Sequence, residues 1–249
     1  MNKKTSSSVK ILPAILFWMA AWHILALRMD NFLLLPTPVM VLRRLGELAL
    51  TAQFWQITLF SIGRILVGAV IAMGLGIVLA VLTCTVPLAD SLIAPVMTAV
   101  QATPVASFTI LVLIWLDRDW VPVLICGMMV LPVVWNNVCA GIRLTDRALL
   151  EMAKVYRLSP MLVLKRIYVP SVMPYFRAAC MSALGLGWKA GIAAEVLTVP
   201  KNSIGKMIAE SKLYMMTEDL FAWTLAVVTL SLLIQTVILR ILKWRAKGC

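Results

Sequence analysis

"LFSIGRILVGAVIAMGLGIVLA", from Leu59 to Ala80, is a long run in which Arg64 is the only charged residue. A helix that spans a membrane needs about 20 consecutive, predominantly apolar residues. This run therefore predicts a membrane span. Runs of the same kind recur along the chain, and we interpret the protein as an all-α membrane protein.

The overall composition supports this interpretation. Hydrophobic residues make up 62% of the 249 residues, whereas an ordinary soluble domain has roughly 45–50%. The alternative is a soluble protein with a very apolar core. That alternative does not explain why the apolar runs recur at membrane-spanning length.

We expect six spans. The first could instead be a signal peptide behind Lys3 and Lys4, but an uncleaved anchor gives an even number of spans. Pro95 and Pro104 predict that the third span is kinked or broken. The six expected spans are Ile11–Leu27, Ile57–Thr83, Leu88–Leu116, Trp120–Ile142, Val172–Val199 and Leu220–Leu242.

The net charge of +12 fits a membrane protein better than a nucleic-acid-binding protein, because most cations lie between the apolar runs. With both termini in the cytoplasm, the inner segments hold roughly twice as many Lys and Arg residues as the outer segments, as the positive-inside rule requires. This orientation also places residues 143–177 in the cytoplasm.

The predicted organisation is one transmembrane domain over residues 1–249, without internal repeats. Residues 1–56 hold the first span and an external amphipathic helix within "PTPVMVLRRLGELAL", in which Val39, Leu42, Leu45 and Leu48–Ala49 share one side. Residues 57–242 form a five-span core, and residues 143–171 form a cytoplasmic loop. A short external helix is expected within "PKNSIGKMIAESKLYMMTEDL" before the last span.

The cytoplasmic loop includes "EMAKVYRLSPMLVLKRIYVPSVMP", Glu151 to Pro174. Thr145 or Asp146 can cap a first short helix, and Ser159 followed by Pro160 can start a second one. We expect Pro170 and Pro174 to end the second helix. Such a pair of helices would lay its apolar faces against the bundle and leave polar tips in the cytoplasm, unless the segment is only a solvated connector.

This loop resembles the coupling loop of permease subunits in ABC importers that use a solute-binding protein. The family pattern reads Glu-Ala-Ala, three residues, Gly, nine residues, Ile and a nearby Pro. The corresponding residues here are Glu151, Met152, Ala153, Arg157, Ile167 and Pro170. "LLPTPVMVLRRLGEL", "LFSIGRILVGAVIAMGLGIVLA" and "GLGWKAGIAAEVL" are similar to segments of the nitrate/sulfonate/taurine-type branch, in the same order.

The resemblance implies a permease subunit of an ATP-driven importer in the bacterial cytoplasmic (inner) membrane. It implies a second permease copy, an extracytoplasmic solute-binding protein, and an ATP-binding subunit that docks on the coupling loop and binds ATP and Mg. The solute would be a small anion such as a sulfonate or nitrate, or a vitamin precursor. The alternative is a secondary transporter or channel subunit without an ATPase, but the inverted repeats typical of that class are not visible.

Arg157 departs from the family pattern, which has glycine between the two helices. A glycine there usually supplies a positive φ, and a larger residue in that conformation costs roughly 1 kcal/mol. Either the turn therefore differs, or Arg157 contributes a contact, for example to an acidic partner surface.

Small residues recur at four-residue spacing in two expected spans. They allow helices to approach closely, either within one subunit or at a dimer or pore face. The candidates for helix packing are Gly68, Ala72 and Gly76 in the second span, and Ala183, Gly187 and Gly191 in the fifth.

Polar residues inside spans are candidates for the translocation path, because ionisable groups there usually face a cavity or a partner. Lys189 and Glu195 are six residues apart, so they lie on different faces of a straight helix. The alternative for Glu195 is a structural ion pair with Arg64. Gln101, Thr103, Asn136 and Asn137 could line the path or bond one helix to another.

Nothing in the sequence predicts chemistry in this chain. It has no phosphate-binding GxxxxGK[ST] motif and no nucleophile with a partner base. The five cysteines form no CxxC pair and the single histidine is His23, so we expect no metal site and no bound cofactor.

Overall fold

The computed structural model describes residues 5–29 and 34–246, and this part of the chain is almost entirely helical, with no strand. The all-α class is therefore confirmed. The helices are α1 (Thr5–Met29), α2 (Pro38–Ala49), α3 (Ala52–Thr85), α4 (Pro87–Ala102), α5 (Val105–Val112), α6 (Val121–Arg143), α7 (Arg147–Val155), α8 (Pro160–Val163), the π-helical segment η1 (Leu164–Tyr168), α9 (Val169–Thr198), α10 (Ile204–Leu213) and α11 (Thr217–Ala246).

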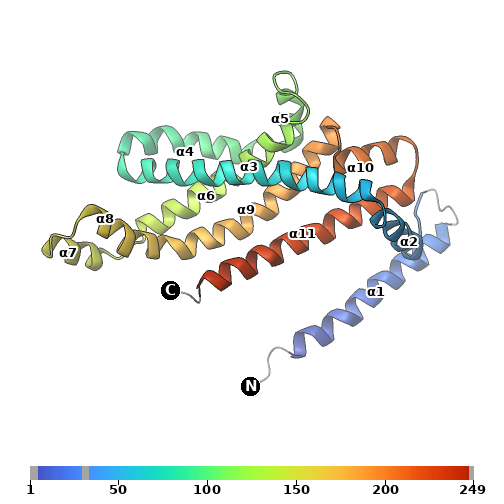
Figure 1. Cartoon of the computed structure of the whole chain (residues 1–249), viewed down its shortest axis with the longest axis horizontal. Coiled ribbons are helices and arrows are strands. Elements are labelled where there is room, and N and C mark those ends of the chain that lie inside the picture. The colour runs from blue at the N-terminus through green and yellow to red at the C-terminus, as the bar shows by residue number, and fades with distance from the viewer. Residues whose placement is uncertain (1–4, 30–33, 247–249) are drawn as a thin grey trace.

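The centre of the bundle is formed by α6, which packs along both α3 and α9 (Figure 1). Glycines on α3 allow this close approach. Gly68 lies so near the carbonyl of Val123 that a side chain would not fit, and a Cβ at Gly76 would lie 3.1 Å from Val134. Ala72, between them on the same face, is also buried.

The small residues of α9 face the same centre. A Cβ at Gly187 would lie 2.8 Å from Val130 on α6, and one at Gly191 would lie 2.7 Å from Ile65 on α3. Ala183 has no exposed surface. This face of α9 is therefore buried within the subunit.

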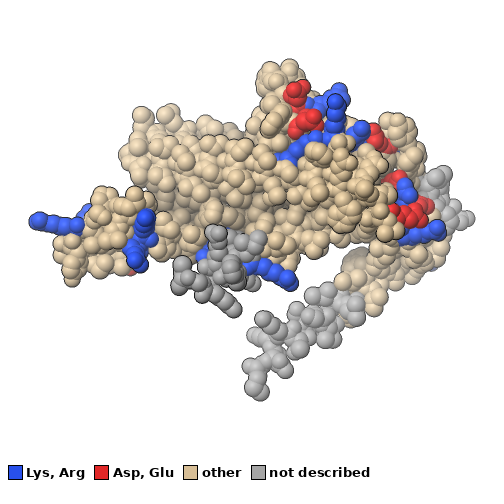
Figure 2. Space-filling view, viewed as in Figure 1, with Lys and Arg blue, Asp and Glu red and all other residues tan. Residues whose placement is uncertain are grey.

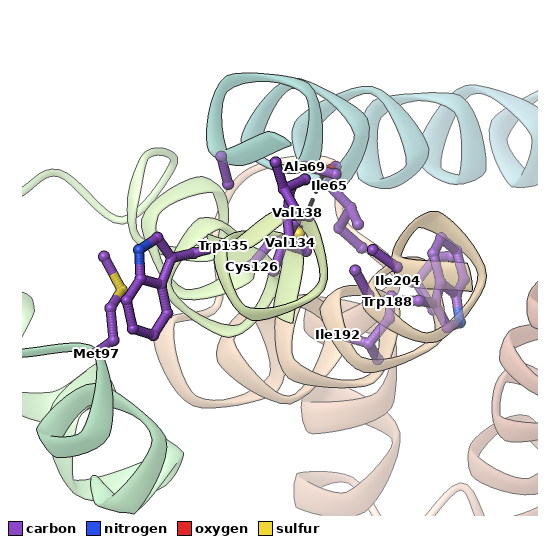
Figure 3. Close-up of a cluster of buried hydrophobic side chains, with 14 of the residues drawn as sticks. Ile65, Ala69, Met97, Cys126, Val134, Trp135, Val138, Trp188, Ile192 and Ile204 are labelled. Atoms are coloured by element: carbon purple, nitrogen blue, oxygen red, sulfur yellow. Dashed lines mark hydrogen bonds between the residues drawn. The ribbon is translucent and has the colours of Figure 1, made fainter. Parts of the chain in front are cut away.

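Side chains from four helices fill the space between α3, α6 and α9 (Figure 3). Ile65 and Val134 meet Trp188 and Ile204 in one continuous apolar cluster. At one side of the cluster the buried ring of Trp135 lies beside Met97 of α4. The indole N–H of Trp135 donates to the Thr83 hydroxyl at 3.0 Å, which satisfies a polar group that would be costly to bury alone.

The third expected span is broken, as its prolines predicted. Helix α4 ends at Ala102, α5 begins at Val105, and the two helices are bent by 102°. Pro104 is the N-cap residue of α5, and the extended backbone at Thr103 is the conformation favoured before a proline. Pro95, by contrast, lies inside α4.

By length and composition, three helices of the described chain are able to cross a membrane, namely α3, α6 and α11. A fourth is added if the bent α4–α5 pair counts as one span. Helix α9 is long enough, but Arg177, Lys189 and Glu195 lower its hydropathy. The apolar part of α1, Pro13–Met29, is shorter than these three helices.

The two short helices expected on the external side are present as α2 and α10. Thr37 caps α2 by accepting the Met40 N–H at 3.4 Å. The residues of the predicted apolar side of α2 have different surroundings, because Val39 and Leu42 are exposed. Leu45 and Leu48 instead pack against the central cluster.

Candidate functional site

The segment between α6 and α9 starts with a well-defined helix cap. Of the two candidates, Asp146 caps α7, and its carboxylate accepts the Ala148 N–H at 2.9 Å. Thr145 is buried and donates to the carbonyl of Gly141 at 3.1 Å. The hydroxyl of Thr145 therefore holds the end of α6, and the carboxylate of Asp146 begins α7.

Helix α7 ends in the turn that the family builds with glycine. Leu158 N–H bonds to Ala153 C=O at 2.9 Å, and Arg157 N–H bonds to Lys154 C=O at 3.1 Å. This pair of bonds is the Schellman motif, which places its C′ residue in the left-handed region. Arg157 has φ 51°, so the turn keeps the geometry that suits glycine, and the first of our two alternatives is wrong.

The side chain of Arg157 forms no stabilising contact within the described part of the chain. It is exposed, and it makes no hydrogen bond or ion pair with any residue that the structure describes. The left-handed backbone therefore costs roughly 1 kcal/mol without an intramolecular contact to offset it. A contact with another subunit would provide one.

We expect Arg157→Gly to strengthen this turn, because glycine removes the left-handed penalty of roughly 1 kcal/mol. Hydrogen exchange at the Arg157 and Leu158 amide positions should slow by about fivefold, as follows from that energy. The control is Arg147→Gly in the first turn of α7, where a glycine should speed exchange in α7. Faster exchange in Arg157→Gly would contradict the assigned strain.

The second half of the segment differs from our expectation. After Ser159, α8 passes through the π-helical η1, in which Val169 N–H bonds to Leu164 C=O, and continues directly into α9. Pro170 lies in the first turn of α9 and Pro174 lies inside it, so neither proline ends a helix. Proline is tolerated in a first turn, where its missing N–H is not needed.

We expect from the sequence that the apolar side chains of this segment lie against the bundle. The structure shows that this prediction is wrong. Figure 1 shows α7 and α8 projecting from one end of the bundle. Val155 is 79% exposed, Tyr156 73% and Met161 60%. Ala153 and Ile167 are the buried residues of α7 and η1. We call the structure formed by residues 146–168 the α7–α8 knob.

The sequence motif is distributed over the surface and the interior of the knob. Glu151, Met152 and Arg157 are exposed, whereas Ala153 and Ile167 are each 5% exposed. Lys and Arg side chains project from this end of the molecule (Figure 2). An exposed surface that mixes apolar and charged groups is typical of a protein interaction site.

Three of the polar residues predicted for the translocation path are exposed, and one is buried. Gln101, at the end of α4, and Asn136 on α6 are exposed, and so is Lys189 on α9. Glu195 is completely buried within the chain. Among the described residues, no hydrogen bond or ion pair joins these four side chains to one another, and their part in transport stays a prediction.

Glu195 belongs to a buried polar cluster at the other end of α9. Its carboxylate accepts the Ser61 hydroxyl at 2.8 Å and the Gly205 N–H at 3.2 Å. Ser61 in turn accepts the Ile204 N–H at 2.9 Å. Because the N-terminus of α10 carries partial positive charge, it stabilises a carboxylate at this position.

Arg64 completes this cluster. Its guanidinium lies 3.7 Å from Glu195, so the structural ion pair that we considered for Glu195 is confirmed. It also donates to Asp119 at 2.8 Å and to the carbonyl of Lys201 at 2.6 Å. One side chain of α3 thus ties together α9, the loop before α10 and the start of α6.

Sequence reasoning missed Ser61, Asp119 and Gly205. Ser61 precedes Arg64 by three residues, which places both on one face of α3, and this spacing was a usable signal. Nothing in the sequence pointed to Gly205. In the structure, a side chain at this position would collide with Glu195. Among the described residues, no group of His, Cys, Asp and Glu side chains has the arrangement of a metal site.

A second ion cluster fastens α2 to the last helix. Arg44 bonds to Asp219 at the start of α11 and to Glu47 at 3.2 Å. Hydrogen bonds from Arg44 and Arg43 lower the pKa of Glu47 below its ordinary value, because they favour the charged carboxylate. This cluster therefore fixes the amphipathic helix beside the end of the bundle that also holds Arg64.

Known proteins resemble the chain along most of its length. It is 24% identical over 241 residues to a protein of Bacillus subtilis (strain 168) that is provisionally named an aliphatic sulfonates transport permease, with 94% of this chain and 86% of that protein covered. It is 31% identical over 146 residues to the bicarbonate transport system permease protein CmpB of Synechocystis, with 58% and 51% covered. The taurine transport system permease protein TauC of Escherichia coli is 21% identical over 242 residues, with 94% and 86% covered.

A family-level match covers the bundle itself. Residues 72–247, which run from the middle of α3 to the end of α11, match the family described as the inner membrane component of binding-protein-dependent transport systems. The match includes the α7–α8 knob and the buried face of α9. The protein therefore belongs to this family of ABC transporter permeases.

Proposed function

We propose that the protein is the permease subunit of an ATP-driven solute importer, and that the α7–α8 knob is where a separate ATP-binding subunit docks. The observation that carries this proposal is the exposed apolar surface of the knob at the residues that match the coupling motif. Helix α7 makes few contacts with the other described helices. The knob is thus available to a partner rather than to its own bundle.

The arrangement of the knob suits the transmission of movement. Each half of the knob has one buried residue, Ala153 in α7 and Ile167 in η1. The chain continues without a break from α8 through η1 into α9, whose face from Ala183 to Gly191 packs tightly on α6 and α3. A push on the knob by the closing ATPase would therefore tilt α9 against the centre of the bundle, since packed cores transmit strain.

The remaining parts of the importer lie outside this chain. We propose six spans, with α1 and α9 added to α3, α4–α5, α6 and α11, and with both termini in the cytoplasm. The path would lie between two copies of the chain, and a solute-binding protein would deliver the solute from outside. The chain would do no chemistry, with ATP and Mg held by the ATP-binding subunit, and it would bind no nucleic acid.

The solute that we favour is a small anion. The relatives are named for sulfonates, bicarbonate and taurine. Lys189 offers an exposed cation on a helix that otherwise carries small apolar residues at this level. A cation in a span is costly and usually faces a partner or a water-filled cavity, and an anionic solute is such a partner.

Labelling of single cysteines tests the orientation and the docking site together. In a chain without native cysteines, a membrane-impermeant reagent added from outside should miss Ser159→Cys on the knob and reach Lys212→Cys at the end of α10. Both positions are exposed in the structure. An ATPase subunit should co-purify with the chain and protect Ser159→Cys from the same reagent in opened membranes. The reverse labelling pattern would place the knob outside and refute the proposal.

A further inference from the structure

An apolar groove of about 460 Å³ runs between α3 and α9, next to the α7–α8 knob. The floor of the groove includes Val138 and Ile142 of α6. Val81 of α3 forms part of one wall and Val169 of α9 forms part of the other. Val81 is 45% exposed and Val169 44%, so the described helices leave both walls uncovered.

The length of the groove fits one leaflet of a bilayer. Its α9 wall extends from Leu164 in η1 to Phe176, which corresponds to about 18 Å of helix at 1.5 Å per residue. One leaflet of the hydrocarbon core is about 15 Å deep. An occupant that lies along the groove would therefore reach from the membrane surface to near its midplane.

The surface end of the groove is basic. Lys165 is exposed and directly follows Leu164, which lines the groove at this end. Lys165 forms no ion pair with any described residue. Arg143 directly follows Ile142 and bonds to Asp90 at 3.1 Å, which uses one of the five donors of its guanidinium.

We propose that this groove binds an acyl chain of an anionic phospholipid, and that Lys165 and Arg143 hold the headgroup. The apolar walls suit the hydrocarbon chain, and the two cations suit a phosphate. A basic pocket on the cytoplasmic side of a membrane protein is the expected form of such a site. The placement of this site on the cytoplasmic side rests on the proposed orientation, but lipid binding needs no ATPase, so its test is separate from the test of ATPase docking.

A second copy of this chain fits the groove less well, because it would have to bring a carboxylate to Lys165. The described acidic residues at this end are Asp90, Asp146 and Glu151. Asp90 is paired with Arg143, and Asp146 caps α7. Glu151 is exposed and is the one described carboxylate left for such a contact, whereas every anionic phospholipid carries a phosphate.

The test is native mass spectrometry of the full chain, purified in detergent with equal amounts of phosphatidylglycerol and phosphatidylcholine. We expect the chain to retain phosphatidylglycerol over phosphatidylcholine by about tenfold, because the choline of phosphatidylcholine would bring a further cation next to Lys165 and Arg143. Val81→Phe should fill the groove and remove most of the retained lipid. Lys165→Gln should leave some lipid bound but abolish the preference for phosphatidylglycerol.

Matched controls separate this site from general effects. Val78→Phe makes the same change on α3 at a residue that is 55% exposed and lies outside the groove lining, so it should retain lipid normally. Lys154→Gln removes a cation from α7 and should leave the preference unchanged. Equal retention in Val81→Phe and Val78→Phe would overturn the proposal. A Val169→Cys variant that forms a disulfide between two chains would overturn it as well, because a second copy would then cover the groove.

Discussion

Replacing Arg64 with methionine should destabilise the folded chain by about 3–5 kcal/mol, the usual result of breaking a buried ion pair from one side. Methionine keeps the length of the side chain but removes its charge and its donors. Glu195, which has no exposed surface, would then lose the cation at 3.7 Å. The carbonyl of Lys201 would lose its donor as well.

Most of the destabilisation by Arg64→Met should come from leaving the carboxylate of Glu195 buried without its cation, and a double variant tests this. Glu195→Gln keeps acceptors for Ser61 and Gly205 but carries no charge, so Arg64→Met with Glu195→Gln should be more stable than Arg64→Met alone. The measurement is the unfolding transition of the purified chain in detergent, followed by tryptophan fluorescence. Non-additivity of this kind is the mark of a direct interaction between two residues.

Arg43→Met is the control for this pair of variants. Arg43 bonds to Glu47 at 3.1 Å, but its side chain is 80% exposed. Exposed ion pairs contribute little to stability because water and salt screen them, so the loss of this one should hardly move the transition. If Arg64→Met unfolds like Arg43→Met, the cluster around Glu195 does not hold the helices together in the way described.

Local rules predicted the helices and their ends well. Asp146, one of the two predicted candidates, acts as a cap, and Pro104 breaks the third apolar run, because these effects depend on a few neighbouring residues. The sequence also paired Arg64 with Glu195. The reason is general: two opposite charges in neighbouring spans have few alternatives to each other in a medium without water.

What the sequence could not predict depends on the third dimension. Pro170 was expected to end a helix, but proline breaks a helix only where its ring and missing N–H are not tolerated, and the start of α9 tolerates it. The apolar residues of the α7–α8 knob were expected to face the bundle. Amphipathic spacing shows that an apolar face exists, but it does not show whether the chain itself or another molecule covers that face.

The two clusters of functional interest lie at opposite ends of α9. The buried group around Glu195 fixes one end of the helix to α3 and α10, whereas the other end continues through η1 into the exposed knob. A helix that is held at one end and pushed at the other tilts about the fixed end. This arrangement makes the knob the point at which a change in charge should affect coupling without affecting the fold.

Glu151→Lys should therefore remove most of the ATP-binding subunit from the purified complex while the permease itself stays folded. Glu151 is exposed, and it makes no ion pair within the described chain, so nothing inside the subunit depends on its charge. In the complex, a carboxylate can accept charge-assisted hydrogen bonds from donors on the partner. Truncating one side of such a buried contact costs about 2–5 kcal/mol, and reversal of the charge adds repulsion.

Ala153→Asp should have the same outcome by a different route. Ala153 is 5% exposed, and its carbonyl accepts the bond from Leu158 that closes the turn. A carboxylate at this position cannot be buried without a partner, so the knob would rearrange before it meets the ATPase. Hydrogen exchange in α7 should rise in Ala153→Asp and stay normal in Glu151→Lys.

Both variants are purified from membranes by affinity. We then measure the amount of ATPase recovered and its rate of ATP hydrolysis, with and without solute-loaded binding protein. Lys212→Glu reverses one charge at the opposite end of the molecule and should recover the ATPase as the unmodified chain does. Full recovery and normal stimulation with Glu151→Lys would show that the knob does not carry the contact. The exposed apolar side chains of α7 would then need a different partner, and the proposal that this permease is driven through residues 146–168 would fail.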